Sequence, residues 1–257
     1  MTEPRRAVPP WWPAYEILAM GLGLGLLAVL CLIWMPISLL IHLTVPQRIA
    51  QPLGRRAIAL GFRVYLWLLE RLCLCRFDLA ALDALREEHP LIVAANHPSL
   101  LDAVMIVSRL PEAVCVMKAS LMDNILFGAA ARLARYIRND APLKMILDAR
   151  DNLTQGAHLL IFPEGSRTRR FPVDRCLPSV GLISARAGVP IQTVLIACST
   201  PYLGRDWPLF RRPQLPLTFS LRLGRRFNPP TDLATFARDL ESSFRDSLST
   251  TPQGIPA

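Results

Sequence analysis

The sequence offers little that could form a metal site or a disulfide framework. Its six cysteines include no C-x-x-C pair, and its four histidines are scattered along the chain. A zinc site needs cysteines and histidines at short regular spacings, and a disulfide scaffold is typical of small, cysteine-rich secreted chains. We therefore expect neither, and we expect the thiols to be small buried side chains in a reducing compartment.

Motifs of two further classes are missing. G-x-S-x-G, the turn that exposes the nucleophile of many serine esterases, does not occur. The formal net charge of +9 is not accompanied by a zinc finger, an RNP-type aromatic motif or a basic heptad region, so nucleic acid is the weaker explanation of that charge. Because 52% of the 257 residues are hydrophobic, binding to a membrane surface or to an acidic substrate is the better explanation of the positive charge.

Formal charge is absent from Ile17 to Val45. The segment from Ile17 to Met35 would form a helix of about 28 Å, close to the thickness of the bilayer hydrocarbon. Two tryptophans and a tyrosine precede it, as interfacial aromatics do. Since Pro36 can break a helix, the run predicts either one spanning helix or a helical hairpin embedded in the membrane. A cleaved signal peptide is disfavoured, because the run is long and lacks a clear small-x-small site.

Arginines are more frequent after the apolar run than before it. By the positive-inside rule, this excess places the bulk of the protein on the cytoplasmic side of a membrane. The segment from Gln47 to Arg76 is amphipathic, and it predicts either a helix that faces the core or one that lies on the membrane surface. The apolar positions that define its stripe are Leu60, Val64, Trp67, Leu68 and Leu72.

Short apolar runs alternate with helical patterns from residue 91 onward. This alternation predicts an α/β fold, with a mixed sheet covered by helices. We expect a membrane anchor at residues 1–50, an amphipathic linking helix at 51–80, the α/β domain at 81–230, and a C-terminal helix and tail at 231–257. The predicted strands are Leu91–Ala95, Ala113–Met117, His158–Phe162, Ile191–Ala197 and Leu217–Leu223, and the predicted helices are Pro98–Leu110, Asn124–Ile137, Pro142–Gln155, Ser179–Ala187 and Thr231–Leu248.

A histidine and an aspartate follow the first predicted strand, in the segment N-H-P-S-L-L-D. Within one continuous helix, His97 and Asp102 would lie about 140° apart, so they can meet only if His97 precedes the helix and folds back over its first turn. Pro98 at the first helical position permits this geometry. Asp102 would then fix the imidazole tautomer, and the other ring nitrogen could take a proton from a hydroxyl. The alternative is a capping histidine and an unrelated aspartate at a helix N-terminus.

A second polar motif, F-P-E-G-S-R, begins at the end of the predicted strand His158–Phe162. Gly165 permits a tight turn with exposed backbone N–H groups. Ser166 offers a hydroxyl and Arg167 a forked cation, a set that suits a phosphate group. The alternative is a solvated basic turn, in which Arg167 only braces the backbone through carbonyl groups.

Taken together, N-H-x-x-x-x-D followed by F-P-E-G-S-R resembles the motifs of the lysophospholipid acyltransferase family, which includes the 1-acylglycerol-3-phosphate acyltransferases. The segment V-P-I-Q-T-V is similar to a V-P-I-x-P-V block of that family, with Thr193 where proline is usual. The resemblance covers roughly Leu91 to Arg226. It implies a glycerolipid acyltransferase-like fold that transfers a fatty acyl group from acyl-CoA or acyl carrier protein to a lipid hydroxyl, with no metal and no bound cofactor, at the inner membrane of a bacterium.

The resemblance also implies roles for single residues. His97 is the general base and Asp102 its orienting partner. Acceptor binding is assigned to the second motif and to a lysine after the second strand, that is, to Lys118, Glu164, Gly165, Ser166 and Arg167.

One departure from the family pattern concerns its middle motif, G-x-x-x-x-x-R, whose arginine binds the acceptor phosphate. Arg138 is the best match for that arginine and Arg135 is the alternative, but position 132 is Arg where the motif has Gly. Two further hypotheses therefore stay open. One is an acyltransferase of the same family that acts on a non-glycerophosphate lipid or a pigment, and the other is a catalytically inactive membrane adaptor.

Overall fold

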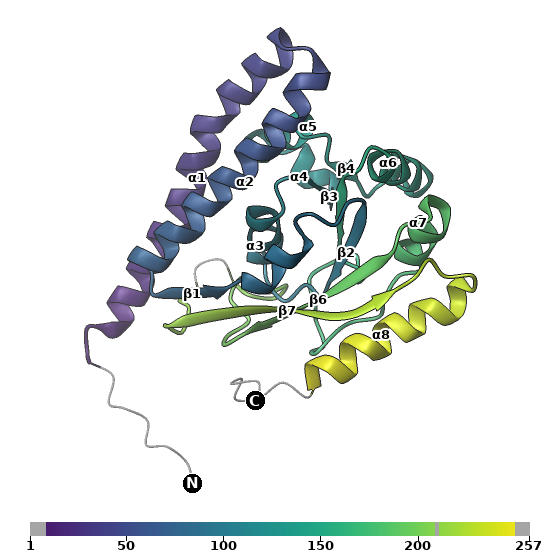
Figure 1. Ribbon diagram of the computed structural model, residues 1–257. Coiled ribbons are helices and arrows are strands. Elements are labelled where there is room, and N and C mark those ends of the chain that lie inside the picture. Colours follow the sequence, from purple (N-terminus) through teal and green to yellow (C-terminus); the bar gives the residue numbers. More distant parts are fainter. Residues whose placement is uncertain (1–8, 209–210, 250–257) are drawn as a thin grey trace.

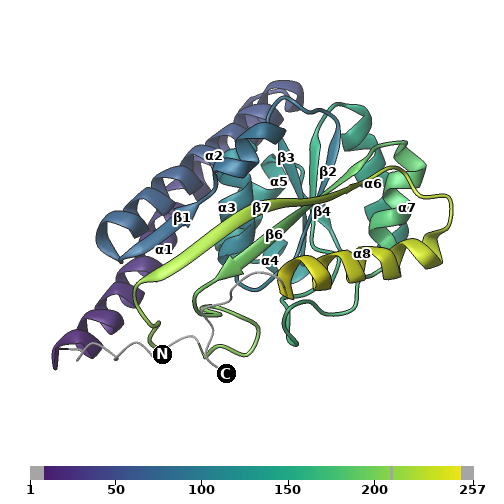
Figure 2. The same ribbon diagram turned by 60° about the horizontal axis from the view of Figure 1, so that its bottom comes forward.

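The computed structural model describes residues 9–208 and 211–249, and its strands form one seven-stranded sheet in the order β1-β7-β6-β2-β5-β3-β4 (Figures 1 and 2). All neighbouring strands in this sheet are parallel except β6 and β7, which are antiparallel, so the predicted mixed sheet is confirmed. The strands are β1 Cys75–Asp78, β2 Leu91–Ala95, β3 Ala113–Met117, β4 Ile137–Arg138, β5 His158–Ile161, β6 Ile191–Cys198 and β7 Leu217–Phe227.

Helices cover both faces of the sheet, with α1, α2, α3 and α5 on one side and α6, α7 and α8 on the other (Figures 1 and 2). Successive side chains of a strand point to opposite faces. Val93 of β2 therefore packs in the core on the α1–α3 side, whereas Ile92 and Ala94 pack under α6–α8. The helices are α1 Trp12–Thr44, α2 Gln47–Leu72, α3 Leu101–Arg109, α4 Ala119–Met122, α5 Ile125–Leu133, α6 Pro142–Thr154, α7 Ser179–Ala187 and α8 Leu233–Ser249, with a 3-10 helix η1 at Ala80–Leu85.

Four boundaries differ from the sequence prediction by three residues or more, and one of them is the end of β7, predicted at Leu223 and found at Phe227. Helix α3 begins at Leu101, so Pro98 lies in the preceding turn and is not the first helical residue. Helix α5 ends at Leu133 because Arg135 adopts a left-handed backbone conformation with φ 55°, after which Ile137 enters β4. Arg76, predicted within the amphipathic helix, lies in β1. Strands β1 and β4 have four and two residues, too few to show an alternating pattern.

Helices α1 and α2 form a long hairpin at one side of the sheet (Figure 1). Helix α1 continues through Pro36, and the chain turns back only at Val45 and Pro46. Among the described residues, α1 is the one helix that is long and apolar enough to cross a membrane: its apolar stretch has a mean hydropathy of 2.6 and is 6% buried. Its 33 residues would extend about 50 Å, more than the hydrocarbon of a bilayer.

The start of α1 is fixed to the α/β domain. The buried carboxylate of Glu16 pairs with Arg212 at 3.0 Å and accepts a hydrogen bond from the backbone N–H of Leu215 at 3.2 Å. The Tyr15 hydroxyl donates to the carbonyl of Leu72 at the end of α2. Because Arg212 and Leu215 belong to the connection from β6 to β7, α1 begins at the edge of the sheet where β6 ends.

Helix α2 is held against the domain through its arginines and exposes its apolar stripe. Arg55 donates to the carbonyl of Ala134 at 3.0 Å and to the side chain of Asn152 at 2.8 Å, and Arg63 donates to the carbonyl of Ser108 at 2.6 Å. The stripe noted in the sequence therefore faces outward, next to the exposed apolar side chains of α1. Its exposed members are Leu60, Val64, Trp67 and Leu72. The predicted tail after residue 249 lies outside the described residues.

Candidate active site

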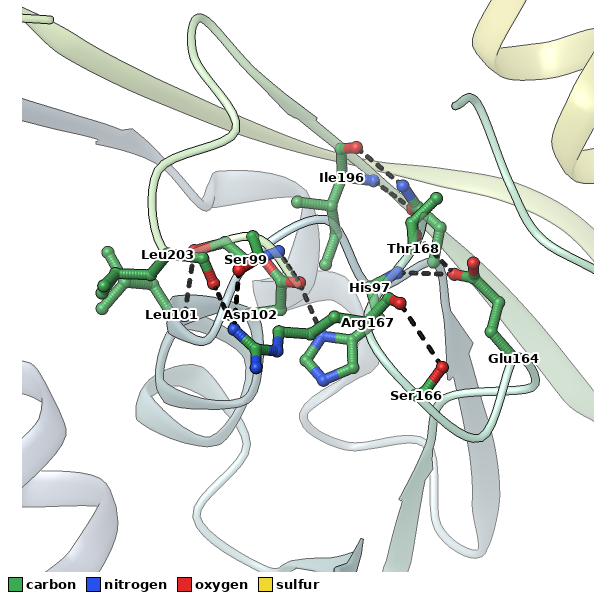
Figure 3. A network of polar contacts seen from close by, with 12 residues as sticks. His97, Ser99, Leu101, Asp102, Glu164, Ser166, Arg167, Thr168, Ile196 and Leu203 are labelled. Carbon is green, nitrogen blue, oxygen red and sulfur yellow. Dashed lines mark hydrogen bonds and ion pairs between the residues drawn. The ribbon is translucent and has the colours of Figure 1, made fainter. Parts of the chain in front are cut away.

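The two sequence motifs meet at the carboxyl edge of the sheet. Strands β2 and β5 are parallel neighbours with Ala94 opposite Ile161, so His97 and Phe162 leave the sheet side by side. Figure 3 shows His97, Asp102, Glu164 and Arg167 gathered at this edge. Residues that follow parallel strands at this edge commonly form the binding sites of α/β proteins.

His97 and Asp102 form the pair that the sequence predicted. The Nδ1 atom of His97 lies 2.8 Å from Oδ2 of Asp102, and the backbone N–H of Ser99 donates to the same oxygen at 2.8 Å. The imidazole stacks on the ring of Phe162, with 3.9 Å between ring centroids and 13° between planes. The His97 side chain is 15% exposed, so the ring is fixed on one side and reachable on the other. With Nδ1 occupied, Nε2 is the nitrogen left for a substrate.

Asp102 is fully buried, and burial raises the pKa of its carboxyl group. The hydrogen bond and the charge of His97, the N–H of Ser99 and the charge of Arg167 all act in the opposite direction and lower that pKa. Its Oδ1 atom has no hydrogen-bond partner among the described residues. A carboxylate in this position fixes the tautomer of the imidazole and stabilises the imidazolium that forms when Nε2 takes up a proton.

Asn96 fastens the strand end that carries His97. Its side chain donates to the carbonyl of Ile196 at 2.9 Å and accepts from the N–H of Ile196 at 2.8 Å. The amide thereby extends the pairing of β2 with β6 by one more position after β2 has ended. This contact fixes the position of the His97 backbone relative to the end of β6.

Glu164 connects the second motif to the first. Its Oε1 atom accepts from the backbone N–H of His97 at 2.9 Å and from the hydroxyl of Thr168 at 2.8 Å, and its Oε2 atom accepts from the N–H of Asp174 at 2.8 Å. Burial raises the pKa of Glu164, whereas these hydrogen bonds lower it. Both oxygens are therefore used to position the loop, and no local sequence pattern indicated Thr168 and Asp174 as partners.

Gly165 makes the turn of the second motif possible. Its φ of 67° lies in the left-handed region, and a Cβ atom at this position would stand 2.8 Å from the side chain of Leu177. The backbone conformation therefore favours glycine, whereas the contact is with the flexible end of Leu177, an exposed side chain that can move.

Arg167 braces the loop that follows β6. Its Nη1 atom donates to the carbonyls of Leu203 and Gly204 at 2.9 and 2.8 Å, and the same Leu203 carbonyl accepts from the N–H of Leu100. The bracing contacts of the alternative interpretation are thus present. They engage one of the three guanidinium nitrogens, and no hydrogen bond joins the other two to a described residue.

Arg205 is a neighbour of this site that the sequence did not reveal. Its Nη1 atom donates to the hydroxyl of Ser166 at 2.6 Å. Arg205 belongs to an irregular connection with no helical or strand period, so no local pattern placed it beside the second motif.

The remaining predicted residues lie further along the same edge. Lys118 is exposed and immediately follows β3, and Arg138 ends β4, the edge strand next to β3. Arg138 forms ion pairs with Asp123 and Asp140, while Arg135 is exposed. The part of the chain described here contains no cluster of His, Cys, Asp and Glu side chains suited to a metal ion.

Comparison with known proteins connects this edge to a family. The family model described as Acyltransferase matches residues 76–197, which include both motifs. The chain is 26% identical over 132 residues to a lysophosphatidylcholine acyltransferase of Drosophila melanogaster, a match that covers 48% of this chain and 24% of that protein.

A solved structure shares the fold. It is the 1-acyl-sn-glycerophosphate acyltransferase of Thermotoga maritima, with a TM-score of 0.66 and 15% identity, and the match covers 92% of this chain and 97% of that one. The matched family model thus covers the strands and loops that hold His97, Asp102 and Glu164, and the solved acyltransferase structure shares the fold around them.

Proposed function

We propose that the protein is a membrane-bound O-acyltransferase that moves a fatty acyl group from acyl-CoA or acyl carrier protein to the hydroxyl of a lysophospholipid. The observation that carries this proposal is the His97–Asp102 pair, with Nδ1 bound to a buried carboxylate and the ring open to a substrate on its other side. A lipid hydroxyl as the acceptor fits a site at the edge of the sheet where α1 begins.

The reaction follows from these groups. Nε2 of His97 accepts the proton of the acceptor hydroxyl as its oxygen attacks the thioester carbonyl. The new C–O bond forms, the C–S bond breaks, and the proton held by His97 passes to the departing thiolate. Asp102 stabilises the imidazolium between these two steps. Because a thiolate leaves readily, one base and correct positioning suffice, and no covalent enzyme intermediate is needed.

We further propose that α1 lies along one leaflet and does not carry the N-terminus across the membrane. The start of α1 is held beside the active-site edge by Glu16 and Arg212, and α2 is held to the domain by its arginines. The exposed stripe of α2 extends the apolar surface of α1, as in a helix pair that is embedded sideways. The cytoplasmic face of a bacterial inner membrane is the location we assign to this arrangement.

Topology can be tested with protease-cleavable tags at the two ends of the full chain in sealed vesicles. Both tags should be cleaved from the same side of the membrane. Cleavage of the N-terminal tag only after the vesicles are opened, with the C-terminal tag cleaved before, would exclude the one-leaflet arrangement.

Acyl transfer is tested by the release of CoA thiol from oleoyl-CoA, with 1-oleoylglycerol 3-phosphate or lysophosphatidylcholine as the acceptor. The wild type should release CoA only when an acceptor is present, and His97→Ala should reduce the rate about 10²–10⁴-fold. His89→Ala, at an exposed histidine far from this edge, is the matched control and should keep the wild-type rate. Equal rates for wild type and His97→Ala would contradict the proposal and favour an inactive adaptor.

A further inference from the structure

Two arginines at the active-site edge have no ion-pair partner in the described part of the chain. Arg167 donates only to backbone carbonyls, and Arg205 donates to the hydroxyl of Ser166. Ion pairs do hold seven other arginines, at positions across the rest of the molecule. Two guanidinium groups left unpaired beside a third polar group are the usual composition of an anion site.

The two arginines are close enough to repel each other. The pKa of Arg167 is lowered first by burial and then by the charge of Arg205, while Asp206 and Asp102 raise it. Arg167 lies within electrostatic reach of Asp102, which itself holds His97. A negative group bound between the two guanidinium groups would relieve this repulsion and would sit next to the base.

Arg138, the best match for the phosphate-binding arginine of the family's middle motif, is in a different situation. Its Nη1 and Nη2 atoms bind Asp123 at 2.6 and 3.3 Å, and its Nε and Nη2 atoms bind Asp140 at 3.2 and 2.8 Å. These two carboxylates raise the pKa of Arg138, and the three side chains together carry a net charge of −1. A phosphate could bind there only by displacing a carboxylate.

From this contrast we infer that Arg205 binds the acceptor, and that Arg205, Arg167 and the Ser166 hydroxyl together hold its phosphate group, while Arg138 stabilises the fold at β4. The inference rests on the proposed acyl transfer and makes it more specific, because it selects an acceptor that carries a phosphate. Ser166 contributes by fixing one nitrogen of Arg205, so that the rest of the guanidinium faces the ligand.

The phosphate belongs to the acceptor and not to the donor, for a geometric reason. In a 1-acylglycerol 3-phosphate, the phosphate lies only a few bonds from the hydroxyl that must reach Nε2 of His97. In acyl-CoA, the whole pantetheine arm separates the phosphates from the thioester. A pair of arginines next to the His97–Asp102 pair therefore suits the nearer phosphate.

The test compares Arg205→Gln with two matched charge-removing variants, Arg138→Gln and Arg169→Gln. Arg169 lies two positions from Arg167 on the same loop, and its side chain is exposed. Steady-state kinetics are measured with 1-oleoylglycerol 3-phosphate varied at saturating oleoyl-CoA, and then the reverse. Arg205→Gln should raise the acceptor KM about tenfold or more with little change in the donor KM. Both comparison variants should stay within about twofold of the wild type.

A binding measurement keeps the inference testable if turnover is absent. Thermal unfolding is followed in detergent micelles that contain either 1-oleoylglycerol 3-phosphate or monooleoylglycerol, which has the same chain and no phosphate. The phosphate-bearing lipid should stabilise the wild type and Arg138→Gln more than monooleoylglycerol does, and this difference should vanish in Arg205→Gln.

Three results would overturn the inference: an unchanged acceptor KM and unchanged lipid stabilisation in Arg205→Gln, a larger effect in Arg138→Gln, or a defect confined to the donor. A fourth outcome would separate the two proposals: the wild type releases no CoA, but the phosphate-bearing lipid still stabilises it in a way that depends on Arg205. This outcome would overturn the proposed reaction and support the phosphate site.

Discussion

Replacing Asp102 with asparagine should lower activity without lowering stability. The asparagine oxygen can still accept from Ser99 N–H and from His97 Nδ1–H, each at about the observed 2.8 Å. What is lost is the negative charge that stabilises the imidazolium during proton transfer. We expect kcat/KM to fall roughly 10²–10⁴-fold, the range for loss of a positioned acid–base function.

The expected stability change follows from the pKa of Asp102, which burial raises above its unfolded value. Between those two values the folded state holds more protons than the unfolded state, so stability from this group is present below about pH 4 and is lost as pH rises through the folded pKa. At pH 7 the buried carboxylate is therefore a net cost, and asparagine does not titrate. The new amide N–H₂ at the unpartnered Oδ1 position costs about 1–3 kcal/mol, which offsets part of the gain.

Thermal unfolding and CoA release measured between pH 4.5 and pH 8 would separate the two effects. The melting temperature of Asp102→Asn should equal or exceed that of the wild type at pH 7, and the difference should shrink as the pH is lowered. A variant that melts well below the wild type but keeps near-wild-type kcat/KM would refute the reasoning, because Asp102 would then serve the fold and not the base.

Three further predictions concern stability. Arg135→Gly should raise the free energy of unfolding by about 1 kcal/mol, measured by urea titration, because glycine adopts the left-handed conformation at φ 55° without the side-chain penalty; a loss of stability would contradict this. Gly165→Ala should lower the melting temperature and the activity together, because a residue with a side chain is strained at φ 67°, and an unaffected variant would show that this turn accepts a side chain. Burial lowers the pKa of His158, so the wild type should lose stability as the pH falls below about 6.5, and His158→Gln should lose less over that interval; identical pH profiles would exclude His158 as the cause.

The parts of the fold that the sequence predicted are those with a local cause. Strands β2 and β3 are bounded as predicted, because a strand buried on both faces is a continuous apolar run. The His97–Asp102 pair could be predicted for a similar reason. Both residues belong to one strand–turn–helix segment, and few geometries of that segment bring the two side chains together. The start of α3 was misplaced because Pro98 suits a turn as well as a first helical position.

Contacts between distant segments could not be predicted in this way. Glu164 meets Thr168 and Asp174 only because the loop after β5 folds over the end of β2. Arg205 contacts Ser166 from the irregular connection after β6, a segment whose sequence has neither a helical nor a strand period. Whether the apolar stripe of α2 faces the core or the outside depends on what packs against each face of that helix. In the structure, the arginines of α2 face the domain, α1 lies beside it, and the stripe is exposed.

The attachment of Glu16 to Arg212 and Leu215 has a kinetic consequence. In the proposed one-leaflet arrangement, an apolar helix held to the connection that bears Arg205 would keep the catalytic edge at the lipid surface, so each acceptor molecule would arrive by lateral diffusion and never have to dissolve in water. Turnover would then be set by the mole fraction of acceptor in the surrounding lipid. Diluting the acceptor with an inert phospholipid should slow the proposed reaction, whereas adding more vesicles of the same composition should leave the rate per protein molecule unchanged.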